Sequence, residues 1–343
     1  MKKYTISFFV GIVAVSILGL IMWLDDDSQK TGLAEIRKVK LGHLVALDMM
    51  PHFVAKEAGF FMEENLDVTL EAFFDVFKNN QALADGEIDF SINPFTLPYF
   101  ALQKGIPIRT ISSAGGWGVI QLVIQGTYGI NSIKELEEYV RLHKDEKIKI
   151  GSFKGDTLDL IVYDAIRAEG LSYNDFEMVW YTDLLEMVKA FKENKIGILA
   201  HIKPYTTDLI KNNDAIFLTD NAQVWGVNTP NCVLSVLETL IVEEPEVMEA
   251  YLRALIKSAQ LINTEPHKAI ALLENSTYPH YFKVGYDVVL EALRSQPAPI
   301  SFTPNVKAVN SVMLDMMELK YIDQYIPGRK LFSLATIKHL EQE

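Results

Sequence analysis

The turn Lys154–Thr157 is the segment of this sequence best suited to contact a small ligand. It follows a strand-like stretch and precedes a helical one, so backbone N–H groups at the helix start, from Lys154 and Gly155 onward, can hold an anionic or strongly polar group together with the Thr157 hydroxyl. Asp156 leaves a second interpretation open, because an aspartate here also caps a helix and stabilises it by about 1 kcal/mol. A carboxylate at this point also disfavours an anionic ligand.

Two further stretches combine residue types that can contact a small molecule. Asn93-Pro94-Phe95 places an amide, which both donates and accepts hydrogen bonds, beside an aromatic ring. The same residues also suit a simple turn. Around Gly116, glycines permit close backbone approach, and Trp117 offers a flat surface for a ring-shaped ligand. Trp117 equally suits a position that covers the core at a strand end, so both interpretations stay open.

Asp48 and Met49 form a third candidate pair, because they lie in the loop expected after the first strand. There they either face a ligand or form the turn. Signatures of catalysis are absent from the sequence: it has no nucleophile elbow, no zinc-protease helix and no phosphate-binding loop, and its seven histidines are scattered. The single cysteine, Cys232, cannot form an intramolecular disulfide or a thiolate metal cluster. We therefore expect a protein without catalytic residues, metal or cofactor.

Alternating strand-like and helical stretches supply the frame for these candidates. The pattern begins with a strand at 39–44, a helix at 51–60 and a strand at 66–74, which together make a βαβ unit. The other expected elements are strands at 88–92, 108–112, 148–152, 176–181, 196–200 and 233–236 and helices at 77–84, 97–104, 158–169, 184–192, 203–211 and 246–263.

This order of elements predicts an α/β fold of two lobes, with the second lobe inserted in the first. We expect lobe 1 to comprise residues 37–124 and 226–343 and lobe 2 to comprise residues 125–225. The chain is expected to cross between the lobes near 121–128 and 218–228. Ligands of α/β folds bind beyond the carboxyl ends of strands and at domain interfaces, so the cleft between the lobes is the expected site.

Three stretches of this frame together resemble one family of proteins. They are LGHLVALDMMPHFVAKEAGFFMEENLDVTL (41–70), ALADGEIDFSINPF (82–95) and IGSFKGDTLDLIVYDAIRAEGL (150–171). In order and spacing they are similar to the solute-binding proteins of ATP-binding-cassette (ABC) transporters, in the branch that takes nitrate, sulfonates, taurine or a thiamine pyrimidine. The resemblance covers about residues 38 to 275.

The resemblance implies a type II periplasmic-binding-protein fold, whose lobes close on a ligand held between them. It also implies that the strand before Asn93 presents side chains to the cleft, and that HIKPY (201–205) lines the cleft in lobe 2. His201 and Tyr205 are therefore candidate contacts, although a lone histidine is more often a hydrogen-bonded structural residue. The stretch NTPNC (228–232), which begins with the candidate Asn228, lies at the return crossing and can contribute polar groups to the cleft.

One enzyme of the same branch builds the thiamine pyrimidine from its own histidine and a bound pyridoxal phosphate. Its lysine and histidine correspond to Asn93 and Leu97 in this sequence, and its cysteine-rich iron motif is reduced to Cys232. Without the lysine no Schiff base forms, and without the histidine there is no donor. The resemblance therefore favours binding over catalysis, and a binding domain turned hydrolase or synthase is a third alternative.

The N-terminus indicates the compartment. Lys2 and Lys3 precede an uncharged run from Tyr4 to Leu24, which as a helix is about 31 Å long, close to the roughly 30 Å hydrocarbon core of a bilayer. Bulky residues at the end of the run argue against cleavage, and the lysines place the N-terminus in the cytoplasm. We expect a signal anchor at 1–27, a tether at 28–36 and an extracytoplasmic body, with a cleaved signal peptide as the alternative.

Composition agrees with an exported binding protein. The chain has 343 residues, 45 acidic and 32 basic side chains and a net charge of -13, which argues against nucleic acid as a partner. We predict a membrane-anchored protein that captures a small polar or heteroaromatic solute and delivers it to an ABC permease and its ATPase. A membrane-tethered ligand sensor built on the same module is the alternative, and the choice between an oxyanion and a ring-shaped ligand stays open.

Overall fold

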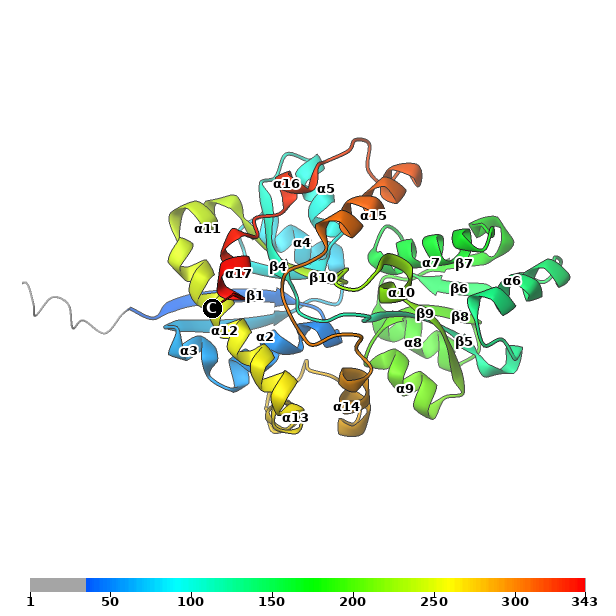
Figure 1. Cartoon of the computed structure of the whole chain (residues 1–343), viewed down its shortest axis with the longest axis horizontal. Helices are drawn as coiled ribbons and strands as arrows, with labels where there is room; N and C mark the ends of the chain where they lie inside the picture. The colour runs from blue at the N-terminus through cyan, green and yellow to red at the C-terminus, as the bar shows by residue number, and fades with distance from the viewer. Residues whose placement is uncertain (1–34, 343) are drawn as a thin grey trace, which may run out of the picture. The chain divides into compact units, whose positions relative to one another are not determined.

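Two five-stranded mixed sheets organise residues 35–342, the part of the chain that the computed structural model describes (Figure 1). The first sheet has the order β2 (Leu66–Ala72), β1 (Arg37–His43), β3 (Phe90–Pro94), β10 (Cys232–Leu237) and β4 (Ile108–Ser113). The second has the order β7 (Glu177–Trp180), β6 (Lys149–Ser152), β8 (Ile198–Ile202), β5 (Ile120–Gln125) and β9 (Ala215–Asp220). Each sheet organises one lobe.

Three of the inner strands are buried along their whole length. Every residue of β3, β5 and β8 is buried, as expected for strands covered by helices on both sides of a sheet. Strand β10 runs antiparallel between β3 and β4, and β5 runs antiparallel between β8 and β9. Each of these two strands therefore joins its sheet from a distant part of the sequence.

Helices lie between and around the strands, as Figure 1 shows. Those that follow strands of the first lobe are η2 (Leu47–Met49), α2 (Met50–Glu57), α3 (Phe60–Glu63), α4 (Val76–Ala84) and α5 (Leu97–Gln103). Those of the second lobe are η3 (Gly126–Tyr128), α6 (Ile133–Leu142), α7 (Thr157–Ala168), η4 (Tyr173–Asp175), α8 (Leu184–Lys192), α9 (Tyr205–Asn212) and α10 (Asn221–Trp225). The C-terminal region adds α11 (Glu238–Glu243), α12 (Pro245–Thr264), α13 (Pro266–Glu274), α14 (Tyr286–Arg294), α15 (Val306–Glu318), α16 (Gly328–Leu331) and α17 (Ala335–Leu340).

The first crossing between the sheets comes earlier in the chain than the sequence pattern predicts. Strand β4 of the first sheet ends at Ser113, and β5 of the second sheet begins at Ile120. The expected crossing at 121–128 is therefore wrong, because this apolar run is a central strand of the second sheet. The connection is formed by the glycine-rich stretch 114–119. The return crossing lies at 221–231, close to the expected position.

The long helix α12 joins the C-terminal region to the first lobe. Its predicted apolar face is confirmed, because Val247, Tyr251, Leu255 and Ala259 are all buried. The Tyr251 ring stacks on Phe90 with centroids 4.2 Å apart, and α12 packs against α2 and α3. This packing attaches the C-terminal region to the start of β3 and to the helices that follow β1.

The structure does not extend to the expected membrane anchor. Tyr4–Leu24 and most of the expected tether lie outside the described residues. Within residues 35–342, none of the helices combines the length and hydrophobicity needed to cross a bilayer.

Candidate functional site

Four chain segments, far apart in sequence, meet where the two sheets face each other. They are the 3-10 helix after β1, the end of β3, the start of α7 after β6, and the start of β10. The start of β10 lies at this edge because Cys232 pairs with Pro94, the last residue of β3. The two sheets thus contribute polar residues to one place, as expected for a cleft beyond the carboxyl ends of strands.

Hydrogen bonds join these segments into one network. The Cys232 N–H donates to Asp48 Oδ2 at 2.9 Å, and the Thr157 hydroxyl lies 2.8 Å from Asn231 Oδ1. The second of these contacts spans the two lobes, because Thr157 begins α7 and Asn231 immediately precedes β10. We call Asp48, Asn93, Asp156, Thr157, Asn231 and Cys232 the interlobe cluster; all of them are buried.

Asp156 and Thr157 owe their positions to the start of α7. Asp156 is the N-cap, and its Oδ1 accepts a hydrogen bond from Leu158 N at 2.7 Å. The turn before it contains Gly155 with φ of 77°, a backbone conformation that glycine adopts without strain. Gly155 N donates to Asp159 Oδ2 at 2.9 Å. The two interpretations of Asp156 are therefore compatible, since the same carboxylate caps the helix and belongs to the cluster.

Several buried polar atoms in and beside the cluster, acceptors as well as hydroxyls that can also donate, have no partner. Asp48 Oδ1 and Asn93 Oδ1 are buried without a hydrogen bond, as are the hydroxyls of Thr96 and Ser152 on the adjoining turns. Thr157 Oγ1 lies within reach of both Asn231 Oδ1 and Asp156 Oδ1, so its one hydrogen is shared between two acceptors. Buried polar groups are normally paired, so unpaired ones at the junction of two lobes indicate a place where a ligand supplies the partner.

Burial dominates the electrostatics of the cluster. It raises the pKa of Asp48 to about 6, although the hydrogen bond from Cys232 N opposes the shift. Burial also raises the pKa of Asp156 to about 7, against the hydrogen bond from Leu158 N. The pKa of the Cys232 thiol is raised well above its usual range by burial and then by the negative charges of Asp48 and Asp156. Both carboxylates thus act on the same thiol, which therefore stays protonated.

Other residues expected at the site support the cluster or lie beside it. Phe95 N donates to Asn231 O at 3.0 Å, and Gly116 packs directly on Asp48, where an added Cβ would lie 2.9 Å from the Asp48 Cβ. Met49 is buried in the core next to Asp48. Lys154, in contrast, is exposed, so only its turn, and not its charge, reaches the buried cluster.

Four of the expected contacts are engaged elsewhere. Trp117 is fully buried, and its Nε1 donates to Pro299 O at 3.1 Å, which matches the core-covering interpretation. His201 Nε2 lies 3.0 Å from Leu184 O within the second lobe, and Tyr205 packs edge-on against the His201 ring. Asn228 is exposed, whereas Asn231 of the same loop joins the cluster.

Lys203 is a residue of this region that the sequence patterns do not single out. It lies between the candidates His201 and Tyr205, and it is the single buried lysine or arginine in residues 35–342. Its carbonyl accepts a hydrogen bond from Leu47 N, and its Nζ donates to Ser295 O at 3.1 Å. Burial lowers its pKa to about 8, opposed by Asp220. Lys203 therefore ties the second lobe to the loop beside Asp48, with its charge directed away from that loop toward Ser295.

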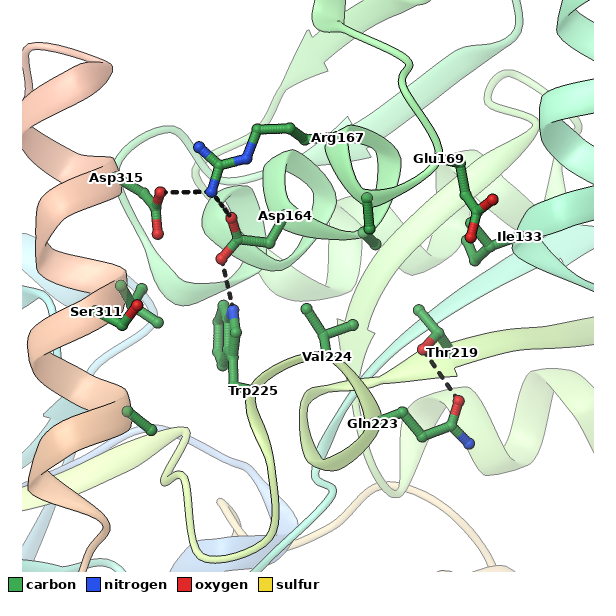
Figure 2. A pocket seen from close by; sticks show the side chains of 14 residues that line it. Ile133, Asp164, Arg167, Glu169, Thr219, Gln223, Val224, Trp225, Ser311 and Asp315 are labelled. Atoms are coloured by element: carbon green, nitrogen blue, oxygen red, sulfur yellow. Dashed lines mark hydrogen bonds and ion pairs between the residues drawn. The ribbon is translucent and has the colours of Figure 1, made fainter.

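A half-open cavity of about 600 Å³ lies beside the same helix but further along it (Figure 2). Arg167 reaches across it from α7 to α15, with Nη2 2.8 Å from Asp315 Oδ1 and 3.0 Å from Asp164 Oδ1. Trp225 Nε1 donates to Asp164 Oδ2 at 2.7 Å. Asp164, Arg167 and Asp315 are paired with one another here, so the interlobe cluster, with its unpaired polar atoms, is the stronger candidate site.

The Arg167 contacts are expected to stabilise the pairing of α7 with α15. We expect Arg167→Ala to lower the free energy of unfolding by about 1–2 kcal/mol at pH 8, because it leaves buried Asp315 without its cation. The pKa of Asp315 is already raised to about 6, mainly by burial, so the loss should be smaller at pH 5, where this carboxyl is protonated. Urea unfolding at both pH values measures the effect.

Arg141→Ala is the matched control, because Arg141 pairs with Glu137 within one exposed helix. It should cost no more than about 0.5 kcal/mol at either pH. Equal losses in the two variants would show that the Arg167 contacts between α7 and α15 add nothing beyond an ordinary surface pair.

Metal-ligating side chains do not gather at one place in the part of the chain that the structure describes. No group of three or more histidine, cysteine or acidic side chains in residues 35–342 has an arrangement that suits a metal ion. Leu97 is a buried first residue of α5, and Asn93 points its amide nitrogen at Ser91 Oγ, 3.2 Å away. Asn93 therefore offers a ligand the hydrogen bonds of its side-chain amide, and Leu97 offers only apolar packing.

Known proteins share this architecture, both in sequence and in structure. Residues 32–273 match the model of the NMT1-like family. The alkanesulfonate-binding protein SsuA from Xanthomonas axonopodis pv. citri, solved with MOPS, superposes with a TM-score of 0.73 at 15% identity, covering 88% of this chain and 100% of that one. The nitrate-binding protein NrtA from Synechocystis PCC 6803 has a TM-score of 0.76 at 16% identity, covering 90% and 89%. No curated protein matches the sequence. At these identities the solved structures show the two-lobe periplasmic-binding-protein fold.

Proposed function

The chain belongs to the NMT1-like family, and from this premise we propose that it is the solute-binding component of an ABC importer. In this proposal the two lobes close on a small solute, and ligand contacts to both lobes shift the population from open to closed. The resemblance inferred from the sequence is confirmed by the family match and by the shared fold. SsuA and NrtA, the two solved proteins named above that share this fold, are binding proteins, which agrees with a role in binding rather than catalysis.

One observation carries the proposal: polar groups from both lobes meet in a single buried network. The contact of Thr157 with Asn231 joins α7 of the second lobe to the start of β10 in the first. The Leu47 N–H donates to Lys203 O at 2.9 Å, which is a second link between the lobes. Polar links of this kind, with neighbouring acceptors unpaired, suit a closed conformation that a ligand completes. A micromolar dissociation constant, about -8 kcal/mol, suffices for such a role.

The location and the partners extend the proposal. We propose that the uncharged run at Tyr4–Leu24 anchors the body on the outer face of the membrane, where the solute is passed to a permease and its ATPase. The acidic excess of the chain then serves solubility outside the cell and requires no nucleic-acid partner.

A binding screen tests this function. The full-length protein in detergent is melted in the presence of small oxyanions, sulfonates, amines and nitrogen heterocycles, and a true solute is expected to raise the unfolding midpoint. Thr157→Val keeps the shape of the side chain and removes the hydroxyl. It should therefore lower the affinity of the protein for that solute. A midpoint unmoved by every class, together with no co-purification of a permease and its ATPase, would contradict an importer role.

A further inference from the structure

We propose that residues 303–331 form an arm of the first lobe that grips helix α7 and holds the second lobe in the closed conformation when no solute is bound. The arm comprises α15, α16 and the loop between them. It lies after residues 32–273, the part of the chain that matches the family model. The inference rests on the proposed function, because such an arm has a role only if the lobes open and close around a solute.

Both ends of the arm are attached to β4, the edge strand of the first sheet. Before the arm, Ser113 N donates to Phe302 O at 2.8 Å. After it, Ser333 N donates to Thr110 O at 2.8 Å, and Phe332 forms a parallel bridge with Thr110. The arm therefore leaves the first sheet and returns to the same strand, so it moves with the first lobe.

The middle of the arm contacts the second lobe at two levels of α7. Toward the end of the helix, Arg167 Nη2 lies 2.8 Å from Asp315 Oδ1, and Nη1 lies 3.1 Å from Glu318 Oε2; Figure 2 shows Asp315 on α15 facing Arg167. At the start of the helix, the Tyr321 hydroxyl donates a hydrogen bond to the Asp159 carboxylate. The second lobe cannot swing away from the arm without losing contacts at both levels.

Asp159 connects the arm to the ligand-facing turn of the second lobe. Its Oδ2 accepts a hydrogen bond from Gly155 N at 2.9 Å, and Gly155 directly precedes Asp156 of the interlobe cluster. The Tyr321 ring also lies beside this turn, because a Cβ added to Gly155 would lie 3.9 Å from Tyr321 Cδ2. The arm and a solute in the cleft therefore act on the same turn.

The interface between the arm and α7 suits a contact that is made and broken. A half-open cavity of about 600 Å³ lies between α7, α10 and α15 (Figure 2), and the Arg167 side chain that crosses it is 46% exposed. Opening the lobes here separates charged groups that water can solvate, which costs less than separating a closely packed apolar interface. Asp315 is only 9% exposed, so its pair with Arg167 is stronger than an ordinary surface pair.

A second contact between the C-terminal region and the second lobe lies on α9. Lys211 Nζ is 2.6 Å from Asp287 Oδ2 and 3.3 Å from Glu291 Oε2, both on α14. Both carboxylates are exposed, and exposed ion pairs contribute little. The arm, with buried Asp159 and Asp315 in its contacts, is therefore the stronger of these two links.

The distance between the lobes, measured without a solute, tests the arm. Spin labels are attached to Lys78→Cys and Glu186→Cys, which are exposed positions near the starts of α4 and α8 on opposite lobes. Cys232 is buried and stays unlabelled. Pulsed electron paramagnetic resonance on the full-length protein in detergent should show mainly a short distance. Tyr321→Phe combined with Arg167→Ala should raise the ratio of long to short distances at least about fivefold.

A matched control applies the same chemical changes inside the second lobe. Tyr173→Phe removes a hydroxyl that also donates to Asp159, but Tyr173 lies in η4 of the same lobe. Arg141→Ala removes an arginine that pairs with Glu137 within α6. The two changes together should leave the ratio of distances as it is in the unmodified background. Thermal unfolding establishes that both double variants are folded.

Tyr321→Phe alone, which keeps the ring, is the second arm variant and should raise the ratio at least about twofold. An unchanged ratio in the arm variants would overturn the proposal, as would a long distance that already dominates in the unmodified background. An equal rise in the control assigns the opening to a loosened second lobe and also overturns it. Each of these outcomes leaves the solute-binding function standing, because that function fails only in the binding screen.

Discussion

We expect Asp156→Asn to become more stable relative to the wild-type protein as pH rises, by about 3 kcal/mol between pH 5 and pH 8 in the absence of ligand. Burial raises the pKa of Asp156 to about 7 from an ordinary value of 3.8. The folded state therefore holds a proton on Asp156 that the unfolded state has already lost above about pH 4.

The sign follows from that difference. A raised pKa stabilises the wild-type fold fully below the ordinary pKa, and this contribution is lost as pH rises through the folded pKa near 7. Asparagine does not titrate and its side-chain oxygen can still accept from Leu158 N, so the variant lacks this pH dependence. The buried neutral histidines titrate identically in both proteins and cancel in the comparison.

Thermal or urea unfolding at the two pH values measures the change. Asp183→Asn is the control, because Asp183 caps α8 in the same way, with its Oδ1 2.8 Å from Leu185 N, but lies outside the cluster. A change of the same size in Asp183→Asn would assign the effect to helix capping. If Asp156→Asn gained stability at pH 8 and also lost affinity for a solute found in the binding screen, the carboxylate would be retained for binding at the expense of stability.

The second large effect is expected from Gly116→Ala, which should lower the free energy of unfolding by about 2 kcal/mol and weaken solute binding at least about tenfold. An added Cβ would lie 2.9 Å from Asp48 Cβ, 3.0 Å from Asp48 Cα and 3.1 Å from Val119 Cγ2. Two of these contacts involve the Asp48 residue itself, so relief of the clash displaces its carboxylate. Urea unfolding measures the first effect, and calorimetry with a solute found in the binding screen measures the second.

Gly197→Ala separates crowding from displacement of the site. Its added Cβ would lie 2.7 Å from Ile148 Cγ2, a similar clash within the second lobe. This control should lose comparable stability and keep its affinity for the solute. If both variants lost affinity equally, the effect of Gly116 would be general destabilisation and not a displaced Asp48.

The periodic part of the architecture could be predicted from the sequence. Strands such as β6 and helices such as α8 were expected within a few residues of their observed bounds, because buried strands and amphipathic helices leave distinct patterns. The crossing was misplaced because the apolar run of β5 has the same local pattern in either lobe. Asn93-Pro94 was expected just after the strand, as a ligand contact or a simple turn, but it ends β3, where Pro94 pairs with Cys232.

The candidate site was predictable in its parts and not in its assembly. Asp48, Asp156 and Thr157 stand at strand ends and helix starts, which local patterns identify. Their partner Asn231 is 74 residues from Thr157, and no local pattern specifies that contact. The Trp117 side chain contacts Pro299, which is 182 residues away in the sequence. The burial of Trp117 could therefore not be predicted from the glycines around it. Fixed contacts between distant segments arise only when both sheets are in place.

The position of β10 has a consequence for the order in which the protein is completed. All strands of the second sheet lie between Ile120 and Asp220, so that sheet can form from one continuous stretch of chain. The first sheet lacks its strand between β3 and β4 until residues 232–237 have been synthesised. Because Cys232 also supplies the N–H that holds Asp48, the binding cluster is assembled last, after the inserted lobe has had time to fold.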